Sequence, residues 1–341
     1  MSVIADPGER ITLAHGDGGE ATHRLIADVF YPAFGNPALL QGGDSALLTL
    51  PAPGRLAMTT DSFVVQPLFF AGGDLGRLAV CGTVNDLAVA GAQPLWLSAG
   101  FIIEEGFLVA ELRRLVAAMA QAAAEAGVQV VTGDTKVVGR GQADGCFINT
   151  AGVGLVPAGR DLGAHRIQTG QAIIVSGPVG EHGVAVLSAR AGLDFETPVQ
   201  SDAGPLAALA ATVLRAAPGA ACMRDPTRGG LATALADLAA ESGLDLQVAE
   251  REIPIAPAVR GACDMLGLDP LYLACEGRLL LFCPTEQAEE ALAAMRGQPA
   301  GAEACVIGRV GGPGGRALVK TAIGGTRRLE RLAGENLPRI C

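Results

Sequence analysis

Residues 97–131, LSAGFIIEEGFLVAELRRLVAAMAQAAAEAGVQVV, decide the fold class of this 341-residue chain. The apolar run 97–103 has the length and composition of a buried strand. Apolar residues then recur at helical spacing, so we expect a helix over 107–126 that ends at Gly127. A second apolar run, 128–131, predicts the next strand. A strand, a helix and a strand in this order indicate an α+β fold of mixed α/β composition.

The same alternation extends to both sides of this unit. Glycine, proline and mixed charge loosen the pattern around 157–170, which indicates a domain boundary there. We therefore expect two domains and a mobile tail, over residues 1–160, 161–325 and 326–341. The other expected elements are strands over 46–50, 56–60, 146–156, 172–176, 271–275, 279–283, 305–310 and 317–320, and helices over 75–90, 184–191, 205–216, 231–241, 257–266 and 285–295.

The composition excludes several classes of protein. Half of the residues are hydrophobic, but no apolar run approaches the roughly 18 residues of a membrane helix. The first residues lack the basic and then apolar layout of a signal peptide. The formal net charge of −10 argues against non-specific nucleic-acid binding. We expect a soluble, cytoplasmic protein that binds neither nucleic acid nor membrane.

The chain contains eight cysteines, and the last of them is its final residue. No C-x-x-C pair occurs, and the four histidines do not stand at zinc-ligand spacing beside the cysteines. We expect seven of the cysteines to be small core residues. Cys341 differs because chain ends are poorly ordered, and Pro338 and Arg339 would stiffen its approach and favour its thiolate. From the residues alone, this thiol is either a swinging carrier or an unremarkable chain end that forms intermolecular disulfides.

Several aspartates stand beside glycines or where a strand pattern stops. Carboxylates in such places are ligands for Mg²⁺, and glycine lets the backbone approach phosphate oxygens. Each of them singly is equally typical of a turn or a helix cap, so both interpretations stay open. Neither G-x-x-x-x-G-K-[ST] nor G-x-G-x-x-G occurs, so any ATP site must use another architecture. The aspartates are Asp44, Asp61, Asp86, Asp134 and Asp225.

A set of motifs in order along the whole chain resembles the HypE family of hydrogenase maturation factors. The closing Pro-Arg-Ile-Cys together with Thr-Gly-Asp-Thr-Lys-Val-Val is the most specific part of the resemblance. The motifs are His15–Gly19, Thr59–Val65, Pro67–Phe70, Gly72–Asp74, Gly82–Leu87, Glu104–Gly106, Thr132–Val138, Phe147–Thr150, Arg224–Leu231 and Pro338–Cys341.

The resemblance implies the ATP-binding superfamily that includes selenophosphate synthetase and aminoimidazole ribonucleotide synthetase. Its members have an N-terminal domain whose sheet forms a barrel across a homodimer, a C-terminal α/β sandwich domain, and ATP between the two. In the family, the carbamoyltransferase HypF places a carbamoyl group on the terminal cysteine. ATP-dependent dehydration turns this group into a thiocyanate. The HypC–HypD scaffold complex then passes the cyanide to the iron of a nickel–iron hydrogenase.

The resemblance also implies roles for individual residues. Cys341 would carry the carbamoyl group, Lys136 would hold the γ-phosphate or the carbamoyl oxygen, and Glu276 would remove the N–H proton. Mg²⁺ would be held by Asp44, Asp61, Asp86 and Asp134. The nucleotide would contact these four and Asn85, Thr132, Gly133, Thr135, Asp225 and Arg228, although a structural salt bridge is an equal interpretation of Arg228.

Two departures from the family pattern and two alternatives remain. Cys275 stands where the family often has asparagine, so it alters a hydrogen bond or offers a second thiol to Cys341. Ser45 follows Asp44 where the superfamily often has a second acid, which leaves the number of metal ligands open. A small-molecule phosphotransferase of the same superfamily leaves the terminal cysteine unexplained. A non-catalytic thiol carrier leaves the aspartates and glycines unexplained.

Overall fold

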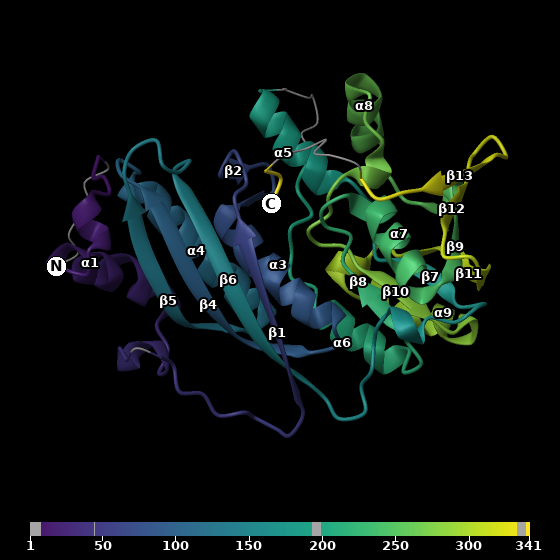
Figure 1. The fold of residues 1–341 in the computed structure, drawn as a ribbon, viewed down its shortest axis with the longest axis horizontal. Coiled ribbons are helices and arrows are strands. Elements are labelled where there is room, and N and C mark those ends of the chain that lie inside the picture. Colours follow the sequence, from purple (N-terminus) through teal and green to yellow (C-terminus); the bar gives the residue numbers. More distant parts are fainter. Residues whose placement is uncertain (1–7, 44, 193–198, 333–338) are drawn as a thin grey trace.

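The computed structural model describes residues 8–43, 45–192, 199–332 and 339–341. Within these ranges the strands form two large sheets, which occupy the two halves of the molecule (Figure 1). A four-stranded sheet lies in the N-terminal half and a seven-stranded sheet lies in the C-terminal half. The end of the chain lies between the two halves (Figure 1), so the tail is placed where both can contact it.

The N-terminal sheet has the strand order β1-β6-β4-β5 and is covered on one face by two helices. Helix α4 joins the parallel strands β4 and β5 and ends at Gly127, whose φ of +70° suits glycine, so the expected strand–helix–strand unit is confirmed. The elements are β1 Arg55–Phe63, β2 Phe69–Phe70, β3 Gly73–Asp74, α3 Leu75–Val89, β4 Gln93–Glu104, α4 Val109–Ala126, β5 Gln129–Val138 and β6 Cys146–Val156.

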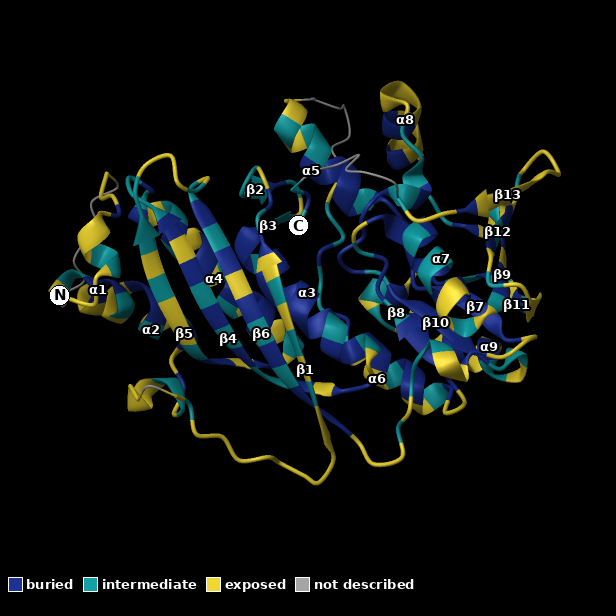
Figure 2. Ribbon diagram, in the orientation of Figure 1, coloured by how far each residue is buried: buried dark blue, intermediate teal, exposed yellow. Residues whose placement is uncertain are grey.

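The other face of this sheet is exposed in the single chain. Exposed residues alternate with partly or fully buried ones along β1 (Figure 2), as the two-residue period of a strand requires. Three large apolar side chains on this face are exposed to water: Leu56 at 61%, Met58 at 76% and Ile102 at 45%. A monomeric soluble protein rarely leaves such a surface open, so this face is available for contact.

Short helices before the sheet pack against β4. They are α1 Glu20–Leu25, a π-helical turn Ile26–Phe30 and α2 Tyr31–Phe34, and the Phe30 ring lies 4.9 Å from that of Phe101. The expected strand over 46–50 is wrong, because these residues are irregular and Leu47 is 79% exposed. Apolar residues form a strand only where a neighbouring strand pairs with them, and within the described residues β1 pairs only with β6.

The C-terminal sheet is covered on both faces. Strand β7 is buried on both sides: Ile173 and Val175 pack with α7, whereas Ile174 packs with α6 and α9. Its continuous apolar run is therefore explained. The elements are β7 Ala172–Val175, α5 Glu181–Ala191, α6 Ala207–Ala216, β8 Cys222–Arg224, α7 Gly230–Ser242, β9 Leu244–Ala249, α8 Pro257–Leu266, β10 Leu280–Cys283, α9 Ala288–Arg296, β11 Cys305–Pro313, β12 Ala317–Lys320 and β13 Thr326–Leu329.

Three expectations for this half need correction. The expected strand over 271–275 is a short 3₁₀ turn, Pro270–Tyr272, followed by an irregular segment. The segment expected to be a tail from residue 326 begins as strand β13, which pairs with β12. Cys305 is only partly buried, whereas the other six cysteines expected in cores are buried. No helix in the described ranges is long and apolar enough to cross a membrane.

Candidate active site at the domain junction

Carboxylates from β1 and α3 lie side by side at the junction of the two halves. Thr59 on β1 donates a hydrogen bond to Asp86 on α3, at 2.7 Å between Oγ1 and Oδ2. Thr83 on α3 donates in turn to Asp61 on β1, at 3.3 Å. Burial and the neighbouring charge of Asp86 raise the pKa of Asp61 above its usual range. Each element thus holds the carboxylate of the other.

The C-terminal half adds two buried carboxyl groups to this pair. Asp225 directly follows β8, and burial and repulsion from Asp86 raise its pKa to about 7. Glu276 is only 2% exposed, and burial raises its pKa well above the usual value, with further contributions from Asp202 and Asp225. Negative charges brought together in this way are relieved by a bound cation or by a proton.

The described residues fit magnesium only in part. Among them, no group of three or more histidine, cysteine, aspartate or glutamate side chains is arranged to hold a metal ion by itself. Mg²⁺ usually takes one or two protein carboxylates and completes its shell with phosphate oxygens and water. Asp61 and Asp86 satisfy that requirement together with a nucleotide, whereas Asp44 lies outside the described residues.

Glu276 has the position of a proton acceptor. Its backbone is fixed from both sides, because its N–H donates to Asp202 Oδ1 at 3.0 Å and its carbonyl accepts from Asn85 Nδ2 at 3.1 Å. Its side-chain Oε1 is buried and has no hydrogen-bond partner among the described residues. An unpaired buried oxygen of this kind is costly for stability, so its retention points to function.

Asn85 connects the two halves of the molecule. Its Oδ1 accepts from Leu206 N at 2.7 Å, and its Nδ2 donates to the carbonyls of Gly204 and Glu276 at 3.1 Å each. The side chain is fully buried, and backbone groups of the other half engage its amide. Asn85 therefore joins the two halves and positions the backbone of Glu276, and its contact with a nucleotide stays a prediction.

The end of the chain places its thiol among these groups. The Cys341 carbonyl accepts from Val64 N at 3.2 Å, and its Sγ lies 3.3 Å from a guanidinium nitrogen of Arg228. Burial and the charge of Glu276 raise the pKa of the Cys341 thiol, whereas Arg228 lowers it. The contact gives Arg228 a role toward sulfur, where we had expected either a phosphate or a salt bridge.

Cys275 is a structural residue. It is fully buried, and its Sγ accepts from Gly180 N at 3.2 Å, directly before α5. Burial raises the pKa of its thiol well above the usual value, so Cys275 carries little thiolate.

The segment Thr132–Lys136 lies elsewhere within one chain. Strand register places Asp134 opposite Gly100, Gly100 opposite Asn149, and Asn149 opposite Ser62, all on the exposed face of the sheet. Asp61 instead faces the helices, and three strand spacings, about 14 Å, separate β1 from β5. We had expected Asp134 and Lys136 to lie beside Asp61 and Asp86. Within a single chain they do not.

These residues line a pocket of their own. It is bounded by β5 from Val130 to Lys136, by Gly16 and Gly18, by described residues between 38 and 46, and by Ala99 and Phe101 on the helix-covered face. Lys136 Nζ donates to Asp134 Oδ1 at 2.9 Å, which lowers the pKa of Asp134. Gly16 approaches the Val137 backbone so closely that a Cβ at residue 16 would lie 2.4 Å from its nitrogen. The pocket brings together Thr132, Gly133, Asp134, Thr135 and Lys136.

Sequence reasoning missed three residues that hold the site together. Asp202 fixes the backbone of Glu276, while His182 and Arg190 donate to the carbonyls of Ile340 and Arg339 at 2.8 and 2.7 Å. None of the three belongs to a motif that carries the family resemblance. Only their contacts across the junction reveal them.

Comparison with known proteins identifies the family. Models of the N-terminal and C-terminal domains of the AIR synthase related proteins match residues 42–156 and 168–320. "Carbamoyl dehydratase HypE" of Rhodobacter capsulatus is 54% identical over 98% of each chain. Two solved structures are similar: a hydrogenase maturation protein HypE in complex with ATP (TM-score 0.93, 47% identity, 96% of this chain and 99% of that one) and a HypE–HypF complex (TM-score 0.79, 43% identity, 90% and 99%). The chain therefore belongs to the HypE family of carbamoyl dehydratases, within the AIR synthase related proteins.

Proposed function

We propose that this chain catalyses the ATP-dependent dehydration of a carbamoyl group carried on its own Cys341, which gives a protein thiocyanate. The observation that carries the proposal is the docked thiol, with Sγ 3.3 Å from Arg228 and its charge coupled to Glu276. One chain then holds the substrate group, the thiol that bears it and an acceptor for its proton. A small-molecule phosphotransferase has no use for this arrangement.

The chemistry requires that the carbamoyl oxygen become a leaving group. Transfer of a phosphoryl group from ATP to that oxygen, with loss of one N–H proton, achieves this and releases ADP. Loss of the second N–H proton and of phosphate then leaves S–C≡N. Glu276 accepts one of these protons and the departing phosphate takes up the other, and the raised pKa of Glu276 makes its ionised form a strong base. Mg²⁺ held by Asp61 and Asp86 would supply neutralisation of phosphate charge. A cation there would also offset the repulsion from Asp61 and Asp86, which adds to the effect of burial in raising the pKa of Glu276.

The proposal includes a homodimer formed through the exposed face of the N-terminal sheet. Leu56, Met58 and Ile102 give that face its apolar character. The pocket lies at β5 and the carboxylate pair at β1, the two opposite edges of the sheet, so a barrel closed by a second copy would bring the pocket of one chain near the carboxylates of the next. Lys136 would then hold the γ-phosphate. Residues 1–160 would form the ATP-binding and dimerisation domain, residues from 161 to the end of β13 the α/β domain, and the residues after β13 the substrate arm.

The partners follow from the chemistry of the arm. We propose that a HypF-type carbamoyltransferase loads Cys341, and a HypE–HypF complex is among the similar solved structures. A HypC–HypD type scaffold would receive the cyanide. The cytoplasm is the proposed compartment, since the eight cysteines are all free thiols in the described residues.

Mass spectrometry of the C-terminal peptide tests the function. The protein is incubated with its carbamoyltransferase and carbamoyl phosphate, with and without Mg·ATP, and a Cys341→Ala variant serves as control. We expect a carbamoyl adduct on Cys341 that loses the mass of one water only when ATP is present. An adduct that persists with ATP would reduce the protein to a carrier, and an unmodified Cys341 would favour the phosphotransferase.

A further inference from the structure

The last residues of the chain are bound through their main chain, with Arg339 in a turn at a φ of 56°. They lie against residues 64–66, which directly follow β1: Val64 N donates to the Cys341 carbonyl at 3.2 Å, and Gln66 N donates to the Arg339 carbonyl at 3.3 Å. The Arg339 side chain returns a bond from Nε to the Val64 carbonyl at 3.1 Å. These bonds fix the main chain of the last residues against residues 64–66.

The hydrogen bonds to residues 64–66 do not use the carbonyl of Ile340. His182 donates a hydrogen bond to this carbonyl. His182 Nε2 lies 2.8 Å from this oxygen. Because a carbonyl only accepts, Nε2 carries the proton and Nδ1 is the acceptor of the ring. Nδ1 lies 2.8 Å from Ser201 Oγ, so the hydroxyl of Ser201 donates to it. One tautomer therefore serves both bonds.

The His182 ring is held in place by its surroundings. It is fully buried, and its edge packs against the Phe70 ring at 5.5 Å and 85°. Burial lowers its pKa to about 4, so the ring is neutral near pH 7. The Ile340 side chain is also buried, in the core of the N-terminal half. The His182 ring thus binds the backbone of Ile340, while the core of the N-terminal half buries the Ile340 side chain.

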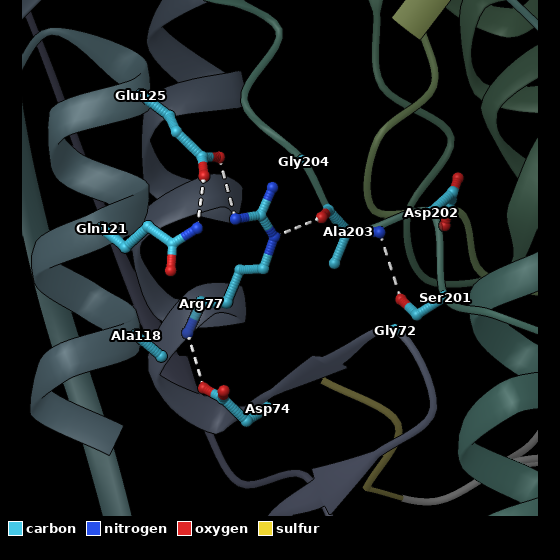
Figure 3. Close-up of a pocket in the computed structure, with 10 residues that line it drawn as sticks. All are labelled: Gly72, Asp74, Arg77, Ala118, Gln121, Glu125, Ser201, Asp202, Ala203 and Gly204. Atoms are coloured by element: carbon cyan, nitrogen blue, oxygen red, sulfur yellow. Dashed lines mark hydrogen bonds and ion pairs between the residues drawn. The ribbon is translucent and has the colours of Figure 1, made fainter. Parts of the chain in front are cut away.

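The partner of His182 belongs to a segment that also fixes Glu276. Ser201 Oγ accepts from Ala203 N at 3.1 Å, and the residue between them, Asp202, accepts from the backbone N–H groups of Glu276 and Gly277 at 3.0 and 3.4 Å. Figure 3 shows Ser201, Asp202 and Ala203 in succession, with the Asp202 carboxylate directed away from the Ser201 hydroxyl. The same short segment therefore contacts the tail on one side and Glu276 on the other.

We propose that His182 is a positioning residue for the substrate thiol. It fixes the docked tail through the Ile340 carbonyl, which sets Cys341 beside Arg228. Through Ser201 and Asp202 it connects that docking to the backbone of Glu276. The role of His182 in positioning the thiol for catalysis rests on the proposed function, but the docking of the last residues is measurable without ATP or any partner protein.

The experiment measures how fast iodoacetamide alkylates Cys341 in the full chain, by mass spectrometry of the C-terminal peptide. His182→Gln keeps a side-chain N–H where Nε2 lies, whereas His182→Asn is too short to reach Ile340 and keeps a partner for Ser201. A lost hydrogen bond is worth about 1 kcal/mol, so we expect alkylation about fivefold faster in H182N. We expect H182Q to stay within about twofold of the wild type.

Two controls keep the result interpretable. Cys305 is partly exposed in the C-terminal half, so its alkylation in the same digest reports general loosening. Ser201→Ala removes the hydroxyl that selects the tautomer and should accelerate Cys341 alkylation with Cys305 unchanged. Equal Cys341 rates in H182N, H182Q and the wild type would overturn the proposal, as would a rise at both cysteines in all variants. Since no ATP is used, neither outcome depends on whether the chain is a dehydratase.

Discussion

Arg228 donates a hydrogen bond from its guanidinium to the Sγ of Cys341 across 3.3 Å. This contact opposes two influences that disfavour the thiolate, burial and the charge of Glu276. The thiol that attacks a carbamoyl donor must be ionised, yet the docked thiol is kept largely protonated. The docked tail therefore suits the step in which the sulfur is already acylated and needs no charge.

We expect Arg228→Ala to raise the pKa of Cys341 in the docked chain, because burial and Glu276 then act without opposition. Arg228→Lys keeps the positive charge, so the pKa of Cys341 in this variant should lie between the values in Arg228→Ala and in the wild type. The pH dependence of Cys341 alkylation measures the pKa. A midpoint that moves to lower pH in Arg228→Ala would show that the contact does not act as described.

Glu276→Gln tests the proton acceptor. Glutamine keeps the shape of the side chain but cannot take a proton, so we expect dehydration to slow by roughly 10²–10⁴-fold. Loading of Cys341 with a carbamoyl group should continue, because Glu276 takes no part in it. The measurement is the ratio of carbamoyl to cyano adduct on the C-terminal peptide over time. A wild-type rate of water loss in Glu276→Gln would remove Glu276 from the mechanism.

Asp225 gives the folded chain a distinct pH dependence. Its folded pKa of about 7 is above its ordinary value, 3.8, so its contribution to stability is complete below pH 3.8 and is lost as pH rises to about 7. Asp225→Asn should therefore stabilise the chain more at pH 8 than at pH 5, and the gain should level off above pH 7. Thermal unfolding in the presence of a chelator measures the difference. An equal change in Tm at both pH values would contradict the raised pKa.

The sequence predicts the fold where local pattern and burial agree. Strand β7 and the β4–α4–β5 unit follow from apolar runs and helical spacing, and the structure places them as expected. Residues 46–50 and 271–275 have the same apolar character but no strand partner among the described residues. Pattern records which residues avoid water, whereas strand formation also depends on a neighbour distant in sequence.

The sequence predicts which residues belong to the candidate site, but it does not predict where they lie relative to one another. Motifs name Asp61, Asp86 and Asp134 together, but the register of the sheet sends Asp134 to the opposite face. A motif records residue types, and the face that a strand residue occupies depends on pairing. His182 was missed for a related reason, because its role comes from a carbonyl 158 residues away.

The exposed face of the N-terminal sheet leads to the last prediction. If a second copy covers this face, a charge in its centre must be buried without a partner, which is costly enough to prevent association. We expect Met58→Glu to convert a dimer into a monomer, as measured by light scattering during size-exclusion chromatography. Since the pocket with Lys136 lies at the β5 edge of the sheet and the pair Asp61 and Asp86 lies at the β1 edge, the monomer should also lose ATP turnover.

Met265→Glu is the matched control, because Met265 on α8 is 74% exposed, much as Met58 is at 76%, but lies in the other half of the molecule. The same change of charge there should leave the dimer and ATP turnover intact. A Met58→Glu chain that still dimerises would place the interface elsewhere. A Met58→Glu monomer that retains full turnover would instead show that one chain completes the site. The separation between the Lys136 pocket and the pair Asp61 and Asp86 would then be closed by movement within that chain.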